Sequence, residues 1–184
     1  MASFSRDKAA QDLERLSFGP ENLKLGRYWL SLWDGDALPL RARFNPRKVP
    51  SFLPGIAIFE VQPDVSVHCR LFGSALVAAL GNDITGQDLL AMTDESERAT
   101  RLQRYTDVAH GAIGRSIRRG IDRLGEIVLT EEIMLPFGDV TDEGKRQVLF
   151  HANWRPTGIV QGMAELEGVG HVAMKFDAVR LRAA

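Results

Sequence analysis

The chain has 184 residues, 45% of them hydrophobic, which is enough for one domain with a single core. Its formal net charge of -1 argues against a broad nucleic-acid surface, which requires an excess of Lys and Arg. The single cysteine excludes an internal disulfide and any metal site built from several cysteines.

No apolar run reaches the roughly 18 residues that suggest a membrane-spanning helix, so we expect no membrane segment. The chain becomes charged at Arg6 and Asp7, without the apolar stretch of a signal peptide. Together with the lone cysteine, these features predict a cytoplasmic protein.

The N-terminal part predicts two helices. Apolar residues recur at helical spacing over residues 7–16, with Ser5 placed to cap the helix, and again over residues 23–33. Four prolines between residues 39 and 54 then cross to a first strand at residues 56–61.

The stretch from Ser66 to Leu90 changes its local pattern twice. Residues 66–72 alternate with a period of two, which indicates a half-buried strand paired with the first one. A short helix follows to Leu80, and we expect Ser74 to cap it. Thr85 and Asp88 have the spacing of another helix cap. A strand that leads into small helices predicts a lid over a sheet, and hence a pocket.

The second half predicts one long helix and several strands. Asp94 and Glu97 form a capping pair ahead of a helix that reaches about His110. Strands are expected at three places, residues 115–118, 126–135 and 147–154, with a polar loop over residues 136–144. Residues 172–181 alternate, which fits either one more strand or a tail that packs on a partner.

An ordered set of short motifs is spread over residues 25–154. The motifs are Tyr28-Trp29, Leu53-Pro54, Phe59-Glu60-Val61, Arg70-Leu71-Phe72-Gly73-Ser74 and Gly81-Asn82-Asp83-Ile84-Thr85-Gly86. This set resembles a PAS sensor domain. More narrowly, it is similar to the bacterial subfamily in which the PAS domain makes up nearly the whole chain, and Glu132–Phe137 also fits that subfamily's closing sheet.

The resemblance implies an α+β fold: an antiparallel sheet of about five strands with helices packed on one face, plus N-terminal flanking helices. Residues 1–33 would form the helical extension, as part of the same domain or as a dimer interface, and residues 34–184 the PAS-like domain. Flanking helices of this kind commonly mediate dimers in PAS proteins, so the resemblance also implies a homodimer.

The residues that carry catalytic or cofactor chemistry in other proteins do not form a motif here. Cys69 lies in a strand and lacks the helical Asn-Cys-Arg-Phe-Leu motif of the flavin-binding relatives. Ser74 lacks the G-x-S-x-G pattern of a hydrolase nucleophile. Glu131 and Glu132 are adjacent in a strand and point to opposite faces. These departures do not favour a flavin. Haem is not favoured either, and His110 would be the candidate ligand if haem were bound. The cofactor stays unassigned.

The candidate ligand site is a set of residues expected to face the space between sheet and helices. Core packing is the alternative role for each of the apolar members, and Arg70 would either receive an anionic ligand, pair with Glu60, or face solvent. The set is Phe59, Arg70, Phe72, Leu76, Leu80, Leu89, Tyr105 and Trp154.

These observations predict a non-enzymatic sensor or regulatory module. A small, largely apolar molecule, with or without a carboxylate, would bind between the sheet and the helices, and a dimer or a protein partner would read the change. One alternative is an interaction scaffold without a ligand, working through Arg115–Arg123 and the 172–181 tail. Another is a small enzyme in which a histidine or carboxylate moves a proton.

Overall fold

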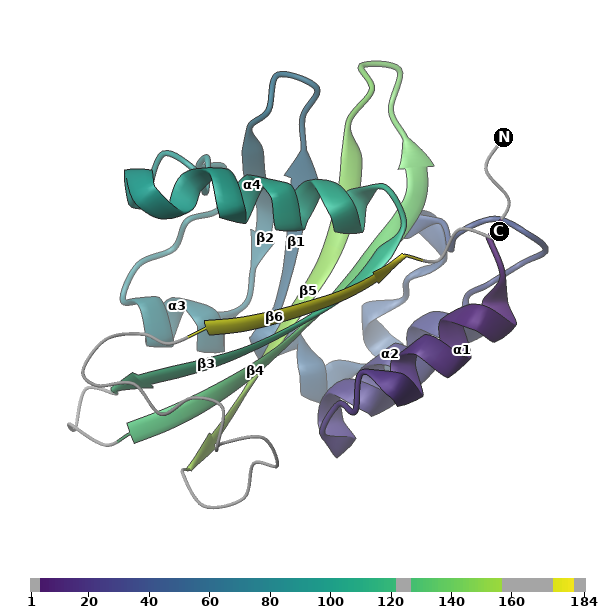
Figure 1. Cartoon of the computed structure of the whole chain (residues 1–184), viewed down its shortest axis with the longest axis horizontal. Helices are drawn as coiled ribbons and strands as arrows, with labels where there is room; N and C mark the ends of the chain where they lie inside the picture. The colour runs from purple at the N-terminus through teal and green to yellow at the C-terminus, as the bar shows by residue number, and fades with distance from the viewer. Residues whose placement is uncertain (1–3, 122–126, 157–173, 181–184) are drawn as a thin grey trace.

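Six antiparallel strands form one sheet at the centre of the molecule (Figure 1), in the order β2-β1-β5-β4-β3-β6. The computed structural model describes residues 4–121, 127–156 and 174–180. The strands are β1 (Ile56–Val61), β2 (Val67–Phe72), β3 (Ala112–Ile121), β4 (Ile127–Val140), β5 (Arg146–Pro156) and β6 (Met174–Arg180).

The sheet is buried on both faces. All six residues of β1 are buried, although successive side chains of a strand point in opposite directions. Ile56 and Ile58 pack into one apolar cluster, whereas Ala57 and Phe59 pack into a second cluster across the sheet. A strand with this pattern requires a covering layer on each side.

Helices α1 (Arg6–Arg15) and α2 (Pro20–Ser31) cover one face of the sheet (Figure 1). Ser5 caps α1 as expected, because its hydroxyl accepts a hydrogen bond from the Lys8 N–H at 3.2 Å. Trp29 of α2 is fully buried and its indole N–H donates to the Pro136 carbonyl at 3.0 Å. The N-terminal helices are thus part of the packed core, and the division at residue 33 stays a prediction.

Three short 3-10 helices lead from α2 to β1. They are η1 (Arg41–Arg43), η2 (Pro46–Lys48) and η3 (Pro50–Gly55). Proline occupies the first position of η2 and of η3, where its missing N–H costs no helical hydrogen bond.

Helices α3 (Ser74–Leu80) and α4 (Glu95–Ala109) lie over the other face of the sheet (Figure 1). The predicted cap at Ser74 is wrong: Gly73 holds the cap position, and no side chain bonds there. Gly81 ends α3 with φ at 85°, in the left-handed region that glycine tolerates. Asp94 precedes α4 as predicted, but its side chain makes no capping hydrogen bond.

The expected helix cap at Thr85 and Asp88 is also wrong. The Asp88 carboxylate instead accepts hydrogen bonds from the backbone N–H groups of Val67 (3.1 Å) and Leu90 (3.0 Å). The Cys69 N–H donates to the Gln87 carbonyl at 3.0 Å. This loop therefore runs along β2 and satisfies backbone groups at the outer edge of the sheet.

The later strands are longer than predicted. β3 extends beyond the expected residues 115–118 at both ends, and β4 continues through Pro136 to Val140 with a shift of register. The proposed loop over residues 136–144 is correspondingly shorter. Residues 174–180 form β6, which pairs with β3, so the strand alternative for the 172–181 segment is the correct one.

A candidate ligand cavity between the sheet and helices α3 and α4

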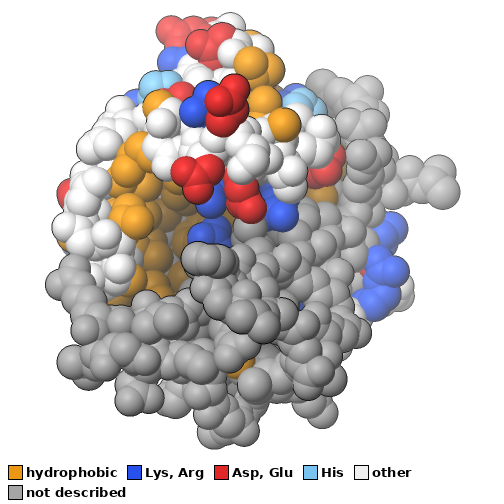
Figure 2. All heavy atoms as spheres, turned by 60° about the vertical axis from the view of Figure 1, so that its left-hand side comes forward, with side chains coloured by type: hydrophobic (Ala, Val, Ile, Leu, Met, Phe, Trp, Pro, Cys, Tyr) orange, Lys and Arg blue, Asp and Glu red, His pale blue; other side chains and the backbone are white. Residues whose placement is uncertain are grey.

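A cavity of about 250 Å³ lies between the sheet and the α3–α4 layer. Figure 2 shows a hollow walled by hydrophobic side chains, with cationic side chains beside it. The walls come from β1, β2, β3, β4 and β5 on the sheet side and from α3, α4 and the 84–89 loop on the other. The lining residues are Phe59, Phe72, Leu76, Ala79, Leu80, Ile84, Leu89, Arg101, Tyr105, Arg118, Thr130, Glu132, Phe150, Ala152 and Trp154.

Aromatic side chains fix one wall of the cavity. Phe59 of β1 contacts Tyr105 of α4 edge to face, with ring centroids 5.0 Å apart, and contacts Phe150 of β5 in the same way at 5.8 Å. Edge-to-face packing is a favourable arrangement for aromatic pairs and holds the rings in place. This wall is therefore preformed.

The structure brings most of the predicted site residues together. Seven of them line the cavity, and their role in binding stays a prediction: Phe59, Phe72, Leu76, Leu80, Leu89, Tyr105 and Trp154.

Arg70 is the exception, because it does not line the cavity. Its side chain is 57% exposed and its Nε lies 3.9 Å from Glu60 Oε2. The ladder between β1 and β2 shifts register between Ile58 and Phe59, and Arg70 is the residue left without a partner in the ladder. This bulge turns the Arg70 side chain away from the cavity. Of the three alternatives for Arg70, which were an anionic ligand, Glu60 or solvent, the structure shows the ion pair with Glu60.

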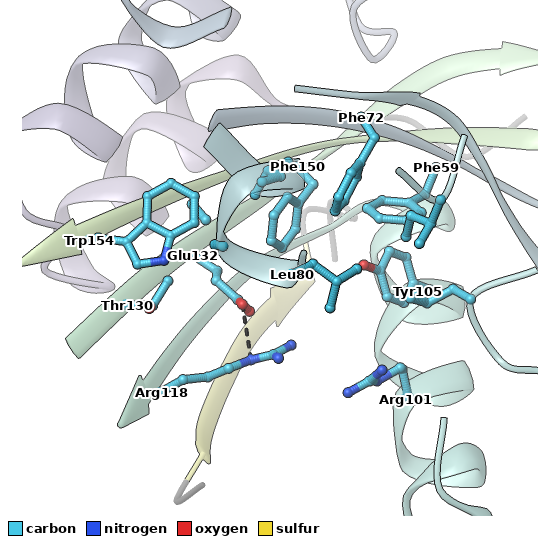
Figure 3. A pocket seen from close by; sticks show the side chains of 15 residues that line it. Phe59, Phe72, Leu80, Arg101, Tyr105, Arg118, Thr130, Glu132, Phe150 and Trp154 are labelled. Carbon is cyan, nitrogen blue, oxygen red and sulfur yellow. Dashed lines mark ion pairs between the residues drawn. The ribbon is translucent and has the colours of Figure 1, made fainter. Parts of the chain in front are cut away.

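Four polar residues at one end of the cavity were missed by the sequence reasoning (Figure 3). Arg118 of β3 approaches Glu132 of β4, with Nε 2.9 Å from Oε1, and Thr130 lies beside them. Arg101 reaches the same end from α4 and donates from Nη1 to Thr93 Oγ1 at 2.9 Å, which orients its side chain. The cavity thus combines an apolar body with a charged end.

The second oxygen of Glu132 has no hydrogen-bond donor among the described residues. Oε2 is buried, and the glutamate side chain is only 5% exposed. The Arg118 Nε–H is close to Oε1 but is not aligned with it for a hydrogen bond, so the contact is purely ionic. A buried carboxylate oxygen without a donor is unusual in a folded protein.

Tyr105 contributes a hydroxyl to the same region. Burial, followed by the nearby Glu132 charge, raises the pKa of Tyr105 well above its usual value. The phenol therefore stays neutral at physiological pH and can donate or accept a hydrogen bond.

The opposite face of β4 carries a different polar cluster, built around Glu131. Its carboxylate accepts hydrogen bonds from the Gly19 N–H at 2.9 Å, from Asn22 Nδ2 at 3.0 Å and from Arg115 Nη2 at 2.7 Å. Asn22 Oδ1 in turn lies 2.7 Å from Nδ1 of the buried His151. The expectation that Glu131 and Glu132 face opposite sides is confirmed.

The cysteine and the candidate haem ligand lie outside the cavity lining. Cys69 is buried in β2, and burial raises the pKa of its thiol to about 11, so it stays protonated. His110 is exposed at the end of α4, with Nδ1 2.8 Å from the Thr106 carbonyl oxygen. In the described part of the chain, no cluster of three His, Cys, Asp or Glu side chains is arranged to hold a metal.

Comparison with known proteins identifies the family. Among curated proteins none matches this chain. The solved structures that it is similar to include the PAS domain of an HTR-like protein from Haloarcula marismortui, at 17% identity over 59% of this chain and 96% of that chain, with a TM-score of 0.36. They also include the VqmA dimer of Vibrio cholerae, presented as a LuxR-type receptor, at 14% identity over 67% of this chain and 56% of that chain, with a TM-score of 0.39.

A family model described as PAS domain matches residues 18–149, which is most of the chain. The match includes α2, the helices on the cavity face and most of the sheet, and it is consistent with the antiparallel α+β architecture. None of the described helices has the length and apolar character needed to cross a bilayer. The chain belongs to the PAS domain family.

Proposed function

We propose that this PAS domain is a sensor or regulatory module that binds a small, largely apolar ligand in the cavity under α3 and α4. The supporting observation is a cavity with an aromatic and aliphatic wall and a charged end, formed where sheet and helices meet. Ligand sites typically combine a mostly apolar wall with a few well-placed polar groups.

The cavity has room for a small molecule. A dry protein cavity of roughly 150 Å³ holds a benzene ring. The cavity here is about 250 Å³, which accommodates one ring or branched chain with a short polar head. Two arginines and one glutamate at the charged end favour a ligand that carries an acid.

The signal would pass through the sheet. β4 contributes Met134 to the cluster under α3 and α4, and its neighbours Ile133 and Leu135 to the cluster under α1 and α2. Because close-packed layers move together, a ligand that shifts one layer changes the packing of the other. A homodimer or a protein partner in contact with α1 and α2 would read that change.

The two alternatives have weaker support. Within Arg115–Arg123, the segment expected to serve a scaffold surface, Arg115 and Arg118 are engaged by Glu131 and Glu132, and β6 pairs within the sheet. Residues 122, 123, 172, 173 and 181 of the two scaffold segments lie outside the described residues. For an enzyme, Glu132 does supply a buried acid that faces the cavity. However, the residues that line the cavity include no His, Cys, Ser or Lys to work with it as a base or nucleophile. The hydroxyls in the lining are those of Thr130 and Tyr105, and the raised pKa of Tyr105 keeps its phenol neutral.

Native mass spectrometry of the purified protein, with a thermal-shift screen of small apolar acids, tests the proposal. We expect either a copurified mass that dissociates on denaturation or a ligand that raises Tm by several degrees, because ligand binding to the folded state stabilises it. An empty protein that no compound stabilises would overturn the sensing function.

A further inference from the structure

The Glu132 oxygen without a hydrogen-bond donor restricts the chemistry of a ligand that would fit the cavity. Oε2 is buried, belongs to a residue that lines the cavity, and lacks a donor among the described residues. Ser116 lies directly opposite Glu132 in the ladder between β3 and β4, yet its buried hydroxyl makes no hydrogen bond either. Leaving a buried carboxylate oxygen without a donor is costly, so a donor from a ligand would be strongly favoured.

The charged groups around Glu132 restrict the ligand further. Arg118 is in contact with Oε1 at 2.9 Å, and Arg101 lines the same end of the cavity from α4 (Figure 3). A guanidinium recognises a carboxylate by paired N–H donors. The open acceptor and the two cations therefore belong to the same end of the cavity, and we expect a ligand that satisfies both to hold its donor next to its acid group.

Resting on the proposed sensing function, we propose that the ligand is a small apolar acid with an O–H or N–H donor adjacent to the carboxylate. The donor bonds Glu132 Oε2, the carboxylate faces Arg101 and Arg118, and the apolar body packs on Phe59 and Phe150. Apolar α-amino acids and α-hydroxy acids share this chemistry. A plain acid or a plain amine of the same body satisfies only one half of the charged end.

Four compounds with the same phenyl body separate these features: phenylalanine, 3-phenyllactate, 3-phenylpropanoate and 2-phenylethylamine. Isothermal titration of the full-length protein gives their Kd values. We expect phenylalanine or phenyllactate to bind at least about tenfold more tightly than the other two, since a hydrogen bond to a charged group is worth about that factor. A preference for one of the two over the other identifies the donor as an ammonium or a hydroxyl.

Two isosteric variants assign the roles of the charged groups. Glu132→Gln should weaken the donor-bearing acids, phenylalanine by about tenfold and phenyllactate less, because the amide keeps an acceptor but loses the charge. It should not weaken phenylpropanoate, which has no donor and would gain from the loss of a neighbouring negative charge. Its matched control is Glu60→Gln, since Glu60 is also a buried strand glutamate but lies outside the cavity lining.

Arg101→Gln provides an independent measurement from α4 and should weaken all three acids but not the amine. Arg70→Gln is its control, because Arg70 is an arginine outside the cavity lining. Circular dichroism establishes that each variant is folded before its Kd is compared with the wild-type value.

Equal binding of phenylalanine, phenyllactate and phenylpropanoate, or an unchanged Kd in Glu132→Gln, would overturn the assigned ligand class. So would a failure of all four compounds to bind. If native mass spectrometry then finds a different molecule in the protein, the sensing function stands and only the ligand class is wrong. If it finds none and the wider screen is negative, the proposed function fails as well.

Discussion

Glu131 and Glu132 are neighbours in β4 but lie in opposite environments. Glu131 faces α2, where a backbone N–H, an asparagine and an arginine all donate to its carboxylate. Glu132 faces the cavity, where one oxygen contacts Arg118 and the other has no donor among the described residues. Both are buried, so burial alone does not distinguish their roles.

The two carboxylates differ in whether the described part of the chain supplies hydrogen-bond donors to both of their oxygens. A buried polar group whose partners are all supplied by the chain fixes the packing of the elements that supply them. A buried polar group with an open position is costly until something else fills it. We therefore assign the Glu131 face to holding α1 and α2 on the sheet, and the Glu132 face to the proposed binding of a ligand.

Trp29→Ala should have the largest effect on the free energy of unfolding, because it removes a fully buried side chain between α2 and the sheet. Loss of a buried tryptophan side chain costs about 3–5 kcal/mol of unfolding free energy. Leu80→Ala on the cavity side should cost about 1 kcal/mol or less, since Leu80 is 54% exposed. Urea unfolding measures both, and equal losses would contradict the assignment of the structural core to the α2 face.

Glu131→Gln and Glu132→Gln test the comparison directly. Removing the charge of Glu131 from a fully bonded cluster with Arg115 should cost about 3 kcal/mol, as for a broken buried ion pair. Glu132→Gln should change the free energy of unfolding by only about 1 kcal/mol, because Arg118 is partly solvated. Urea unfolding of both variants without ligand gives the two values, and the reverse order would refute the distinction.

His151 makes the stability of the α2 face depend on pH. Burial lowers its pKa to about 4, whereas the unfolded chain titrates at about 6.5. Between these values the unfolded state binds more protons, so stability falls as pH falls from about 6.5 to about 4, by up to about 3 kcal/mol. His151→Gln should flatten this slope in urea unfolding at several pH values; an unchanged slope would show that His151 does not produce it.

Arg70→Gln should have the smallest effect. Its contact with Glu60 spans 3.9 Å and the arginine side chain is largely exposed, so its loss should cost about 0.5 kcal/mol or less. The Kd of any cavity ligand should not change, because Arg70 does not line the cavity. A large loss of affinity in this variant would mean that the Arg70 side chain takes part in binding after all.

Much of the fold was predictable because its signals are local. The alternation of residues 66–72 and the apolar run of Ile56–Val61 match β2 and β1 closely. β3 was underestimated because Arg115 and Arg118 place cations on both of its faces, and a periodicity argument assigns charges to solvent. In the structure each arginine is paired with a glutamate of β4, a contact between strands that local patterns do not contain.

The candidate site also has one part that local sequence patterns predicted and one part that they did not. Its apolar wall followed from hydrophobic residues at strand and helix spacing. Its charged end did not, because Glu132 and Arg118 meet only through the register of β3 and β4. Their alternation with buried residues was the available signal: Glu132 lies two positions from Met134, on the same strand face. Arg70 was misplaced by a bulge, which shifts side chains without a clear mark in the sequence.

The central claim is that the cavity under α3 and α4 is the site of ligand binding. Ala152 of β5 lines this cavity and is buried, so Ala152→Leu would fill part of it while leaving the α2 face intact. Native mass spectrometry of both purified proteins should show a bound small molecule on the wild type and none on the folded variant. The same bound mass on both proteins would contradict the account, and so would an empty wild-type protein that no compound in the thermal-shift screen stabilises.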